Sequence, residues 1–434
     1  MTTEPSPGQV APQAGPPRAD RRAEQRAVRR RGRGRIALVL ALLAAGGTAA
    51  AVALHRGESA PSASRHLAPV WQVRSPAADD ELIGSWVTGK FLVRASTRGG
   101  VTAYDLADGS TAWTAALPPE VGGGGTQPCA MSPTLTAAGL GTVAFGKDGH
   151  TCTTLAGVDA ATGTVLWTVP LVDAAHPTAM GAKTYLQGGV ATVVGENFLG
   201  GLDVRTGHRV WGFHARGDYC NAYTWGGAGV VLVDDYCADS KTPFTLTAYD
   251  GRTGRTLWSR DQDTHTDIAH VFSGSPLIVS EHAAGEDSVR VVAPSGTTRK
   301  LVVGDTELAP GNDSDADHSA RLVGDVLVTP ASTAHGSEID AFDTATGAKL
   351  WRYPATALAT ATASGDRVYV LAGSPSAPQL VSLDARTGQA HAVAALPDAT
   401  AKQGFTAGTV YVTPDGGVLE LDAQGTGVGV RFSR

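Results

Sequence analysis

The sequence of 434 residues lacks the short motifs that identify several common kinds of catalytic site. It contains no Gly-rich phosphate loop, no G-x-S-x-G nucleophile elbow and no H-E-x-x-H zinc pair. These absences exclude the nucleotide-binding loop, the hydrolase elbow and the zinc protease helix that the motifs encode. Any chemistry in this chain must come from another arrangement of residues.

Basic residues are scarce beyond the N-terminal region. The first 54 residues hold nine of the 35 Lys and Arg and three of the 41 Asp and Glu, so the remainder carries 26 basic and 38 acidic groups and a net charge of −12. A surface that binds nucleic acid is usually basic. The composition therefore argues against a nucleic-acid partner for the part after Leu54.

The N-terminal region does not have the composition of a globular domain. Residues 1–35 are rich in Pro, Ala and Arg, which predicts a disordered basic arm. Residues 36–54 are nineteen uncharged residues, long enough to cross a hydrocarbon core of about 30 Å. We predict a retained transmembrane helix over 36–54 with its arginine-rich flank in the cytoplasm, a linker over 55–67 and a domain outside the cell over 68–434. A cleaved signal peptide is the alternative.

One pattern recurs along the rest of the chain: an alternating apolar run that ends in Asp, a Gly four positions later and a Trp eight positions after the Asp. The complete copies are VTAYDLADGSTAW (101–113), LAGVDAATGTVLW (155–167), LGGLDVRTGHRVW (199–211), LTAYDGRTGRTLW (246–258) and IDAFDTATGAKLW (339–351). The worn copies are VRVVAPSGTTRKL (289–301), LVSLDARTGQAHA (380–392) and VLELDAQGTGVGV (418–430). Eight copies at spacings of 38 to 54 residues indicate a propeller or a solenoid.

Each position of the pattern has a structural explanation. Asp at a strand end can accept hydrogen bonds from the N–H groups of the following turn, and Gly supplies the positive φ that closes a short hairpin. Trp in the next strand can cover the neighbouring sheet. We interpret these residues as structural: Asp105, Trp113, Asp159, Gly163, Trp167, Asp203, Gly207, Trp211, Asp250, Gly254, Trp258, Asp343, Gly347 and Trp351.

A further strand pair precedes each hairpin, for example GGVATVVGE (188–196) and GDRVYVLAG (365–373). Each repeat is therefore predicted to form four short antiparallel strands, with the Asp-to-Gly turn between the third and the fourth. Such units arranged radially make a β-propeller. The period-2 pattern and the 54 Gly residues exclude a helical solenoid. We expect an all-β fold, an eight-bladed β-propeller preceded by one transmembrane helix.

The motif, as in YDGRTGRTLW and FDTATGAKLW, closely resembles the pyrroloquinoline quinone-like (PQQ-like) repeat of eight-bladed propellers. This family includes quinoprotein alcohol dehydrogenases and a non-enzymatic outer-membrane assembly lipoprotein. The resemblance covers roughly residues 68–434 and implies that the tryptophans dock between blades. APVWQVR (68–74) resembles a fourth strand that closes the circle, but the tail GVGVRF (427–432) competes for the same edge, so the sequence leaves the outermost strand open.

The resemblance also allows a test for enzymatic activity. The quinoprotein dehydrogenases of the family use a disulfide between adjacent cysteines, a calcium ion held by acidic side chains and a catalytic Asp. This chain has no adjacent cysteines, and it is shorter than those enzymes. We therefore expect no bound quinone and no catalytic residue.

Polar segments of variable length are expected on the face opposite the uniform Asp-to-Gly turns, and such loops commonly bind ligands. Asp313, Asp315 and Asp317 alternate like the start of a calcium loop, but positions six and twelve of that loop are His318 and Gly324 instead of Gly and Glu. Calcium stays an option beside the interpretation of a solvated acidic loop. In DQDTHTD (261–267), Asp261, Asp263, His265 and Asp267 could ligate a metal, but at this spacing we interpret the segment as a flexible surface loop.

The preferred binding locus combines two neighbouring segments. GDYCNAYTW (217–225) places Tyr219, Tyr223 and Trp225 on one side of an inner strand, and DDYCADSKTP (234–243) contributes Asp234, Asp235 and Tyr236. Packing between blades is the alternative role for the three aromatic residues of the first segment. Otherwise they form an aromatic edge for a partner.

Four cysteines in an exported domain favour disulfides. In the blade arrangement, Cys129 begins a first strand and Cys152 follows the second strand of the same blade, and Cys220 and Cys237 occupy the same two places two blades later. The open ends of one hairpin lie within the Cα separation of about 4.4 to 6.8 Å that a disulfide needs. We predict Cys129–Cys152 and Cys220–Cys237. Four reduced thiols would fit a cytosolic chain instead.

Taken together, the sequence predicts a monomeric, membrane-anchored binding or scaffold protein of the bacterial cell envelope. Its partner would be an envelope protein, a peptide or cell-wall material. The alternatives are a quinoprotein-like oxidoreductase of the envelope and an ectodomain that senses a small ligand or a metal.

Overall fold

The computed structural model describes residues 63–433 without 64, 76, 118–124, 174–177, 179, 196–197, 218–219, 228, 239–243, 284, 309–319, 362–364, 375–376, 397–407, 414 and 424–426. The chain divides into two compact units, residues 1–51 and 52–434, and every described residue belongs to the second. The arm and the transmembrane helix predicted for residues 1–54 lie outside the described residues. Within the described part, no helix is long and apolar enough to span a membrane.

The described residues form β-strands and no helix, which confirms the all-β fold class. Most strands follow the alternating or fully apolar runs of the repeats, which is the pattern of strands buried on one or both faces. Five sheets have four antiparallel strands each, in an order that follows the sequence. They are β2 (Leu82–Val87), β3 (Phe91–Ser96), β4 (Gly100–Asp105) and β5 (Thr111–Ala115); β6 (Gln127–Met131), β7 (Leu140–Gly146), β8 (Thr154–Asp159) and β9 (Val165–Pro170); β10 (Ala182–Gln187), β11 (Val190–Gly195), β12 (Leu199–Asp203) and β13 (Arg209–Gly212); β14 (Cys220–Gly227), β15 (Val230–Cys237), β16 (Phe244–Asp250) and β17 (Thr256–Gln262); β18 (Thr266–Gly274), β19 (Leu277–Ala283), β20 (Glu286–Val292) and β21 (Thr298–Lys300).

Two larger sheets complete the described fold. A five-stranded sheet comprises β22 (Glu307–Leu308), β23 (Arg321–Val323), β24 (Val326–Thr333), β25 (Gly336–Asp343) and β26 (Lys349–Pro354). An eight-stranded sheet consists of two antiparallel halves that join through a short parallel pairing of β27 and β31. Its strands are β27 (Ala357–Ala361), β28 (Arg367–Ser374), β29 (Ala377–Asp384) and β30 (Ala390–Ala395) in one half, and β31 (Gly408–Val412), β32 (Val418–Asp422), β33 (Gly427–Ser433) and β1 (Ala68–Arg74) in the other.

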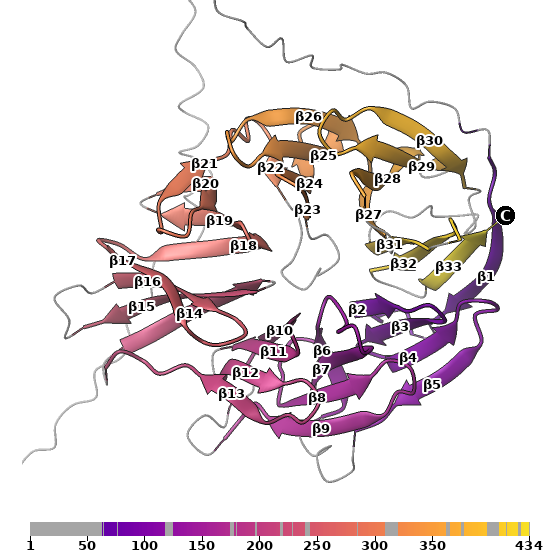
Figure 1. The fold of residues 1–434 in the computed structure, drawn as a ribbon. Coiled ribbons are helices and arrows are strands. Elements are labelled where there is room, and N and C mark those ends of the chain that lie inside the picture. Colours follow the sequence, from indigo (N-terminus) through magenta and orange to yellow (C-terminus); the bar gives the residue numbers. More distant parts are fainter. Residues whose placement is uncertain are drawn as a thin grey trace, which may run out of the picture. The chain divides into compact units, whose positions relative to one another are not determined.

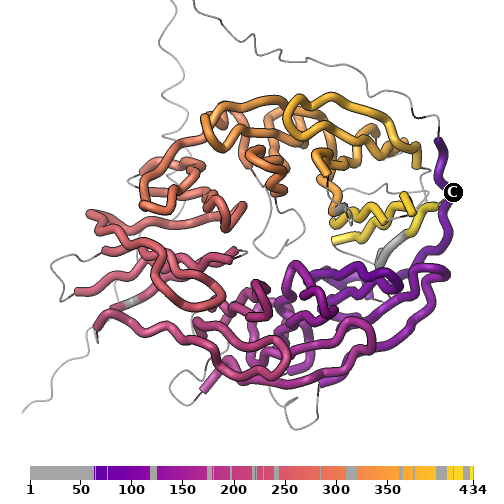
Figure 2. The backbone as a smooth tube through the Cα atoms, viewed as in Figure 1, coloured from indigo at the N-terminus to yellow at the C-terminus, as the bar shows by residue number. Residues whose placement is uncertain are grey.

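Within the second unit the sheets follow one another around a circle (Figure 1), and the backbone trace runs around it in sequence order (Figure 2). The first strands of successive sheets contact one another, for example β2 with β6, β6 with β10 and β14 with β18. The last and first sheets also meet, because the hydroxyls of Tyr411 in β31 and Ser85 in β2 lie 3.0 Å apart. This radial arrangement of antiparallel sheets is that of a β-propeller.

The core lies between neighbouring sheets. One cluster, for example, joins Leu232 of β15 and Trp258 of β17 to Ile268 and Val279 of the next sheet. The apolar faces of each sheet are therefore covered by the sheets before and after it, so the stability of each sheet depends on its neighbours.

The recurring turn has the predicted geometry. Asp250 Oδ1 accepts hydrogen bonds from the backbone N–H groups of Arg252 at 3.1 Å and Thr253 at 2.8 Å, and Gly254 has a φ of +69°. Backbone and hydroxyl donors of the same kind, from Thr346 to Asp343 and from Thr387 to Asp384, hold the pKa of those two carboxyl groups below its ordinary value. The turn is a structural element, as predicted.

Each repeat Trp docks on the turn of the next sheet. The indole Nε1 of Trp211 donates to the carbonyl oxygen of Gly251 at 2.9 Å, and its ring lies so close to Gly254 that an added Cβ would be 2.7 Å from it. Trp167 meets Gly207, and Trp351 meets Gly388, in the same way. The turn thus requires Gly for two reasons: the backbone has a positive φ, and a ring from the preceding sheet lies where a Cβ would be.

The structure settles which strand lies outermost in the last sheet. β33 pairs with β32 on one side and with β1 on the other, so Ala68–Arg74 forms the edge and the tail GVGVRF lies one strand inside it. Trp71 of β1 donates from Nε1 to the carbonyl oxygen of Leu106 at 2.9 Å, as Trp211 does to Gly251 and Trp351 to Ala385. The N-terminal strand therefore closes the circle.

This order corrects the copy predicted at 418–430. VLELD was assigned to a third strand, but in the half of the sheet that runs β31, β32, β33, β1 it forms the second strand, so Asp422 ends a second strand and not a third. No Trp follows this Asp at the repeat spacing, so the worn pattern did not fix its place in the sheet. Asp422 also differs chemically from the turn aspartates, because burial raises the pKa of its carboxyl group.

Candidate functional site

The preferred binding locus lies on β14 and β15, the first two strands of one sheet. Tyr223 pairs with Asp234 across the ladder, and Trp225 pairs with Leu232. Because directly opposite residues project from the same face of a sheet, these four side chains share one face. Tyr223 and Trp225 are therefore brought together as predicted, whereas Tyr219 lies outside the described residues.

The side chain of His265 completes this face, and it was not expected there. His265 precedes β18 in the segment that the sequence suggested was a flexible loop. Its ring centroid lies 4.6 Å from that of Tyr223 and 6.2 Å from that of Trp225. Tyr223 remains 53% exposed beside this contact. The residues around His265 follow no repeat pattern, so only the variable polar character of the loop could have pointed to it.

Asp234 lies beneath His265. Its side chain is fully buried, and its Oδ2 atom is 2.7 Å from Nδ1 of His265. The same oxygen accepts a hydrogen bond from the backbone N–H of Thr266 at 2.6 Å. Burial raises the pKa of the Asp234 carboxyl group despite these partners. A carboxyl group this close limits the orientations that the imidazole ring can take.

Asp235 and Tyr236 belong to other surroundings. Asp235 alternates to the opposite face of β15, where its Oδ2 accepts a hydrogen bond from Nε of Arg216 at 2.7 Å. The Tyr236 ring lies 5.0 Å from the Phe244 ring and is partly exposed. The six predicted binding residues therefore do not form a single site. Of the described ones, Tyr223, Trp225, Asp234 and Tyr236 lie on one face of the hairpin, and Asp235 lies on the reverse.

Exposed carboxylates flank His265 in the sequence. Asp261, Asp263 and Asp267 lie on the segment that runs from the end of β17 into β18, and all three are exposed. In the described part of the chain, no Lys or Arg forms an ion pair with them. Asp261 accepts a hydrogen bond from the Thr245 hydroxyl at 3.4 Å and lies in register with Asp235, on the reverse of the Tyr223 face.

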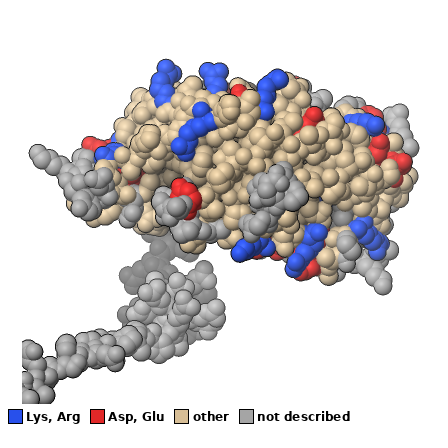
Figure 3. Space-filling view, turned by 90° about the horizontal axis from the view of Figure 1, so that it is seen from below, with Lys and Arg blue, Asp and Glu red and all other residues tan. Residues whose placement is uncertain are grey.

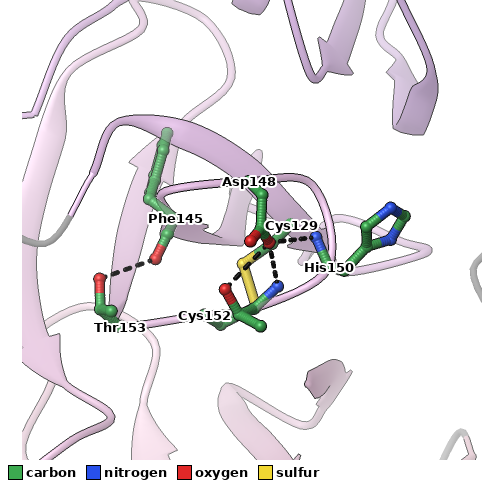
Figure 4. Close-up of a disulfide and its surroundings, with 7 residues drawn as sticks. Cys129, Phe145, Asp148, His150, Cys152 and Thr153 are labelled. Atoms are coloured by element: carbon green, nitrogen blue, oxygen red, sulfur yellow. Dashed lines mark hydrogen bonds between the residues drawn. A yellow bond between two sulfur atoms is a disulfide. The ribbon is translucent and has the colours of Figure 1, made fainter. Parts of the chain in front are cut away.

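Both predicted disulfides are present. Cys129 is joined to Cys152 with a Cα separation of 5.8 Å, and Cys220 to Cys237 with a Cα separation of 4.1 Å. The second bond links the open ends of the β14–β15 hairpin that carries Tyr223. Around the first, Asp148 Oδ1 accepts the backbone N–H groups of His150 and Thr151 and shapes the loop before Cys152 (Figure 4).

No group of three His, Cys, Asp or Glu side chains that could hold a metal ion occurs among the residues that the structure describes. The predicted calcium ligands Asp313, Asp315 and Asp317 lie outside that part of the chain. A calcium site at these three residues therefore stays a prediction.

The part of the outer side around β5 and β9 carries little charge. Figure 3 shows a side view in which Lys and Arg lie along two borders of a broad band with few charged residues. The outer strands TAWTA (β5) and VLWTVP (β9) contain no charged side chain. Chemically distinctive groups are instead concentrated around His265, where aromatic rings, an imidazole and carboxylates offer stacking, hydrogen-bond acceptance and negative charge.

Comparison with known proteins identifies relatives of the fold. The sequence model of a family described as outer membrane protein assembly factor BamB matches residues 152–331 and 335–428. No curated protein sequence matches the chain.

Solved structures resemble this one at low sequence identity. The computationally designed Ika8 protein has a TM-score of 0.53 and 14% identity, over 83% of this chain and 99% of its own. Quinohemoprotein alcohol dehydrogenase from Comamonas testosteroni has a TM-score of 0.50 and 13% identity, over 85% and 76%. BamB from Moraxella catarrhalis has a TM-score of 0.47 and 19% identity, over 85% and 98%. At these identities the first two likenesses concern the fold alone.

Proposed function

Since this chain belongs to the PQQ-like repeat family described as outer membrane protein assembly factor BamB, we propose that it is a non-enzymatic binding or scaffold protein of the bacterial cell envelope. Its partner is a protein or peptide of the envelope, and the surface around Tyr223 and His265 makes the contact. The observation that carries the proposal is a half-exposed Tyr held against an imidazole, which a buried carboxylate orients from below.

The proposed architecture is an eight-bladed propeller on a membrane anchor. Eight groups of four strands support the blade number, if the two halves of the eight-stranded sheet count as two blades and β22 and β23 together supply one inner strand. Residues 36–54 would form a single transmembrane helix, with the basic arm in the cytoplasm and a monomeric propeller outside. Two disulfides favour the oxidising side of the membrane for the propeller.

The arrangement around His265 supports binding better than catalysis. In the described part of this surface, no Ser, Cys or Lys side chain forms a hydrogen bond or an ion pair with His265, as a nucleophile activated by an adjacent base would. Aromatic residues are instead enriched at the centres of protein interfaces, where they contribute much of the binding energy.

Site-specific crosslinking tests the proposal. A photoreactive amino acid replaces Tyr223 in the full chain expressed in its own cells, and crosslinked products are identified by mass spectrometry. Gln72 on the outer strand β1 serves as the control position. We expect one envelope protein or peptide to be captured at position 223 and not at position 72. Equal capture at both positions would contradict a partner site at Tyr223.

A second assay addresses the oxidoreductase alternative. The purified full chain is mixed with pyrroloquinoline quinone and calcium, and dye reduction is followed with a panel of alcohols and sugars. The binding proposal predicts no turnover above that of the free quinone. Substrate-dependent turnover would overturn the non-enzymatic assignment.

A further inference from the structure

We propose that the surface formed by Tyr223, His265, Asp263 and Asp267, called the Tyr223 surface below, binds a lysine- or arginine-bearing segment of the partner protein. The inference rests on the proposed function, because it specifies the chemistry of the partner at the same site. Three separate features of the surface favour a cation.

The first feature is an aromatic ring with an exposed side. Tyr223 is 53% exposed, and its contact with the His265 ring at a centroid distance of 4.6 Å limits the orientation of both rings. Ammonium and guanidinium groups are attracted to the face of an aromatic ring within about 6 Å of its centroid. A flat guanidinium can also stack on the ring.

The second feature is a hydrogen-bond acceptor on His265. Its Nδ1 atom lies 2.7 Å from Oδ2 of Asp234, and the tautomer that carries its hydrogen on Nδ1 keeps a lone pair on Nε2. The His265 side chain is 37% exposed. Nε2 can therefore accept an N–H from a lysine or arginine side chain, both of which are donors only.

Asp234 adds an observation that does not depend on the loop. Its side chain is fully buried and shares the sheet face of Tyr223, and within the described residues its Oδ1 atom has no hydrogen-bond partner. A buried carboxylate oxygen is normally satisfied by a donor. The unsatisfied oxygen places additional negative potential below His265, where an approaching cation would be favoured.

The third feature is the set of carboxylates without counterions. Asp263 and Asp267, each two residues from His265, are exposed and form no described ion pair, whereas other exposed acids such as Asp305 and Glu286 pair with Arg352 and Lys300. Two arginines of the same region are already engaged, since Arg216 pairs with Asp235 and Arg260 with Glu281. The unpaired carboxylates thus favour a positively charged partner.

Binding of defined peptides to the full chain tests the inference. Fluorescent peptides of alternating Lys and Gly, Arg and Gly, and Glu and Gly are titrated by anisotropy at low and at physiological salt. The variants are Tyr223→Ala, Tyr223→Phe, His265→Gln, His265→Ala and the pair Asp263→Asn with Asp267→Asn. Asp366→Asn, an exposed carboxylate in the turn before β28, is the matched control. Circular dichroism verifies that each variant is folded.

We expect the Lys and Arg peptides to bind and the Glu peptide not to bind, with weaker binding at higher salt. Tyr223→Ala should weaken binding by about fivefold and Tyr223→Phe by less than twofold, since the ring face persists. The double Asp variant should weaken it by about threefold to tenfold. His265→Gln keeps an acceptor and should bind more tightly than His265→Ala. Asp366→Asn should have no effect.

Binding of the Glu peptide, or an equal loss with Asp366→Asn and with the double Asp variant, would overturn the inference. So would Lys and Arg peptides that bind Tyr223→Ala as well as the unchanged chain. If crosslinking at position 223 captures a partner while the Lys and Arg peptides fail to bind, the cationic chemistry is wrong and the proposed function stands. If crosslinking captures nothing, the proposed function fails with it.

Discussion

Gly254 illustrates, at the scale of a single residue, why the repeat has so little freedom at this position. It has a φ of +69°, and a Cβ added to it would lie 2.7 Å from the Trp211 ring of the preceding sheet. The backbone conformation and the docking of the ring each exclude a side chain. One Gly therefore couples the closure of a turn to the packing of two sheets.

We predict that Gly254→Ala lowers the free energy of unfolding by about 2 to 5 kcal/mol, because the left-handed conformation and the overpacked ring both add cost. Gly139 is the matched control, since it has a φ of +77° and no atom within 4 Å of an added Cβ. Gly139→Ala should cost only about 1 to 2 kcal/mol. Equal losses in thermal or denaturant unfolding would mean that the Trp contact adds nothing.

Asp234 gives a second prediction at this scale, for stability against pH. Because burial raises its pKa, the folded protein binds a proton more readily than the unfolded chain between the ordinary carboxyl pKa of about 3.9 and the raised value. Stability of the unchanged protein therefore gains from this group as pH falls through that window. Asp234→Asn lacks the group but keeps an oxygen for the Thr266 N–H.

The variant should thus be at least as stable as the unchanged protein at neutral pH, and its advantage should shrink as pH falls. Melting temperatures of both proteins across the acid range measure this difference. A melting temperature of Asp234→Asn that rises relative to the unchanged protein as pH falls would contradict the prediction. Asp366→Asn, which alters an exposed carboxylate, should show no such trend.

At the scale of elements, the β14–β15 hairpin carries both a disulfide and the Tyr223 surface. The Cys220–Cys237 bond spans 17 residues. We predict that replacing both cysteines by Ala lowers the free energy of unfolding by about 3 kcal/mol. It should also speed amide exchange at the open end of the hairpin, as mass spectrometry can follow, while the hairpin with Cys129 keeps its rate. If the two hairpins kept equal protection from amide exchange in this variant, the Cys220–Cys237 bond would not stabilise its own hairpin locally.

Strands, turns and disulfides were accessible to sequence reasoning because each repeats. Asp, Gly and Trp recur at fixed spacing, so five clear copies set the register for the worn ones, and two cysteine pairs at equivalent places defined their partners. His265 and Arg216 occur once each, in segments of variable length. Their contacts with Asp234 and Asp235 depend on how two sheets face each other, which no local pattern records.

At the scale of the whole molecule, β1 holds the circle together. Trp71 donates to the Leu106 carbonyl oxygen, and Arg431 of the neighbouring strand β33 donates to the same atom. We predict that Trp71→Ala costs about 3 to 5 kcal/mol, the usual range for a buried Trp. It should also expose the last and first sheets to limited proteolysis before the others. Gln72→Ala, an exposed neighbour on β1, should change neither quantity.

The worn copy at 418–430 shows the limit of repeat counting at this scale. Its Asp and Gly resembled the others, yet the sheet that contains it takes its fourth strand from the other end of the domain. The sequence did not decide between β1 and the tail as the outermost strand, because both have the pattern of an edge strand. Only the long-range pairing of residues more than 350 positions apart distinguishes them, as with Trp71 opposite Arg431.

That pairing has a consequence for how the chain can be cut and rejoined. Ala68 lies opposite Ser433, so the first and last described strands adjoin where a hairpin loop would connect them. A short linker there, with new termini opened in the turn at Gly188 and Gly189, would keep the pairings among β1 to β33 and lose the bridge between His66 and Ala395. The same fold could then form from a chain that begins at a different strand. In the unchanged chain, the circle cannot close until β33, the last described strand, has been synthesised. In a circular permutant, a different strand would be the last to join.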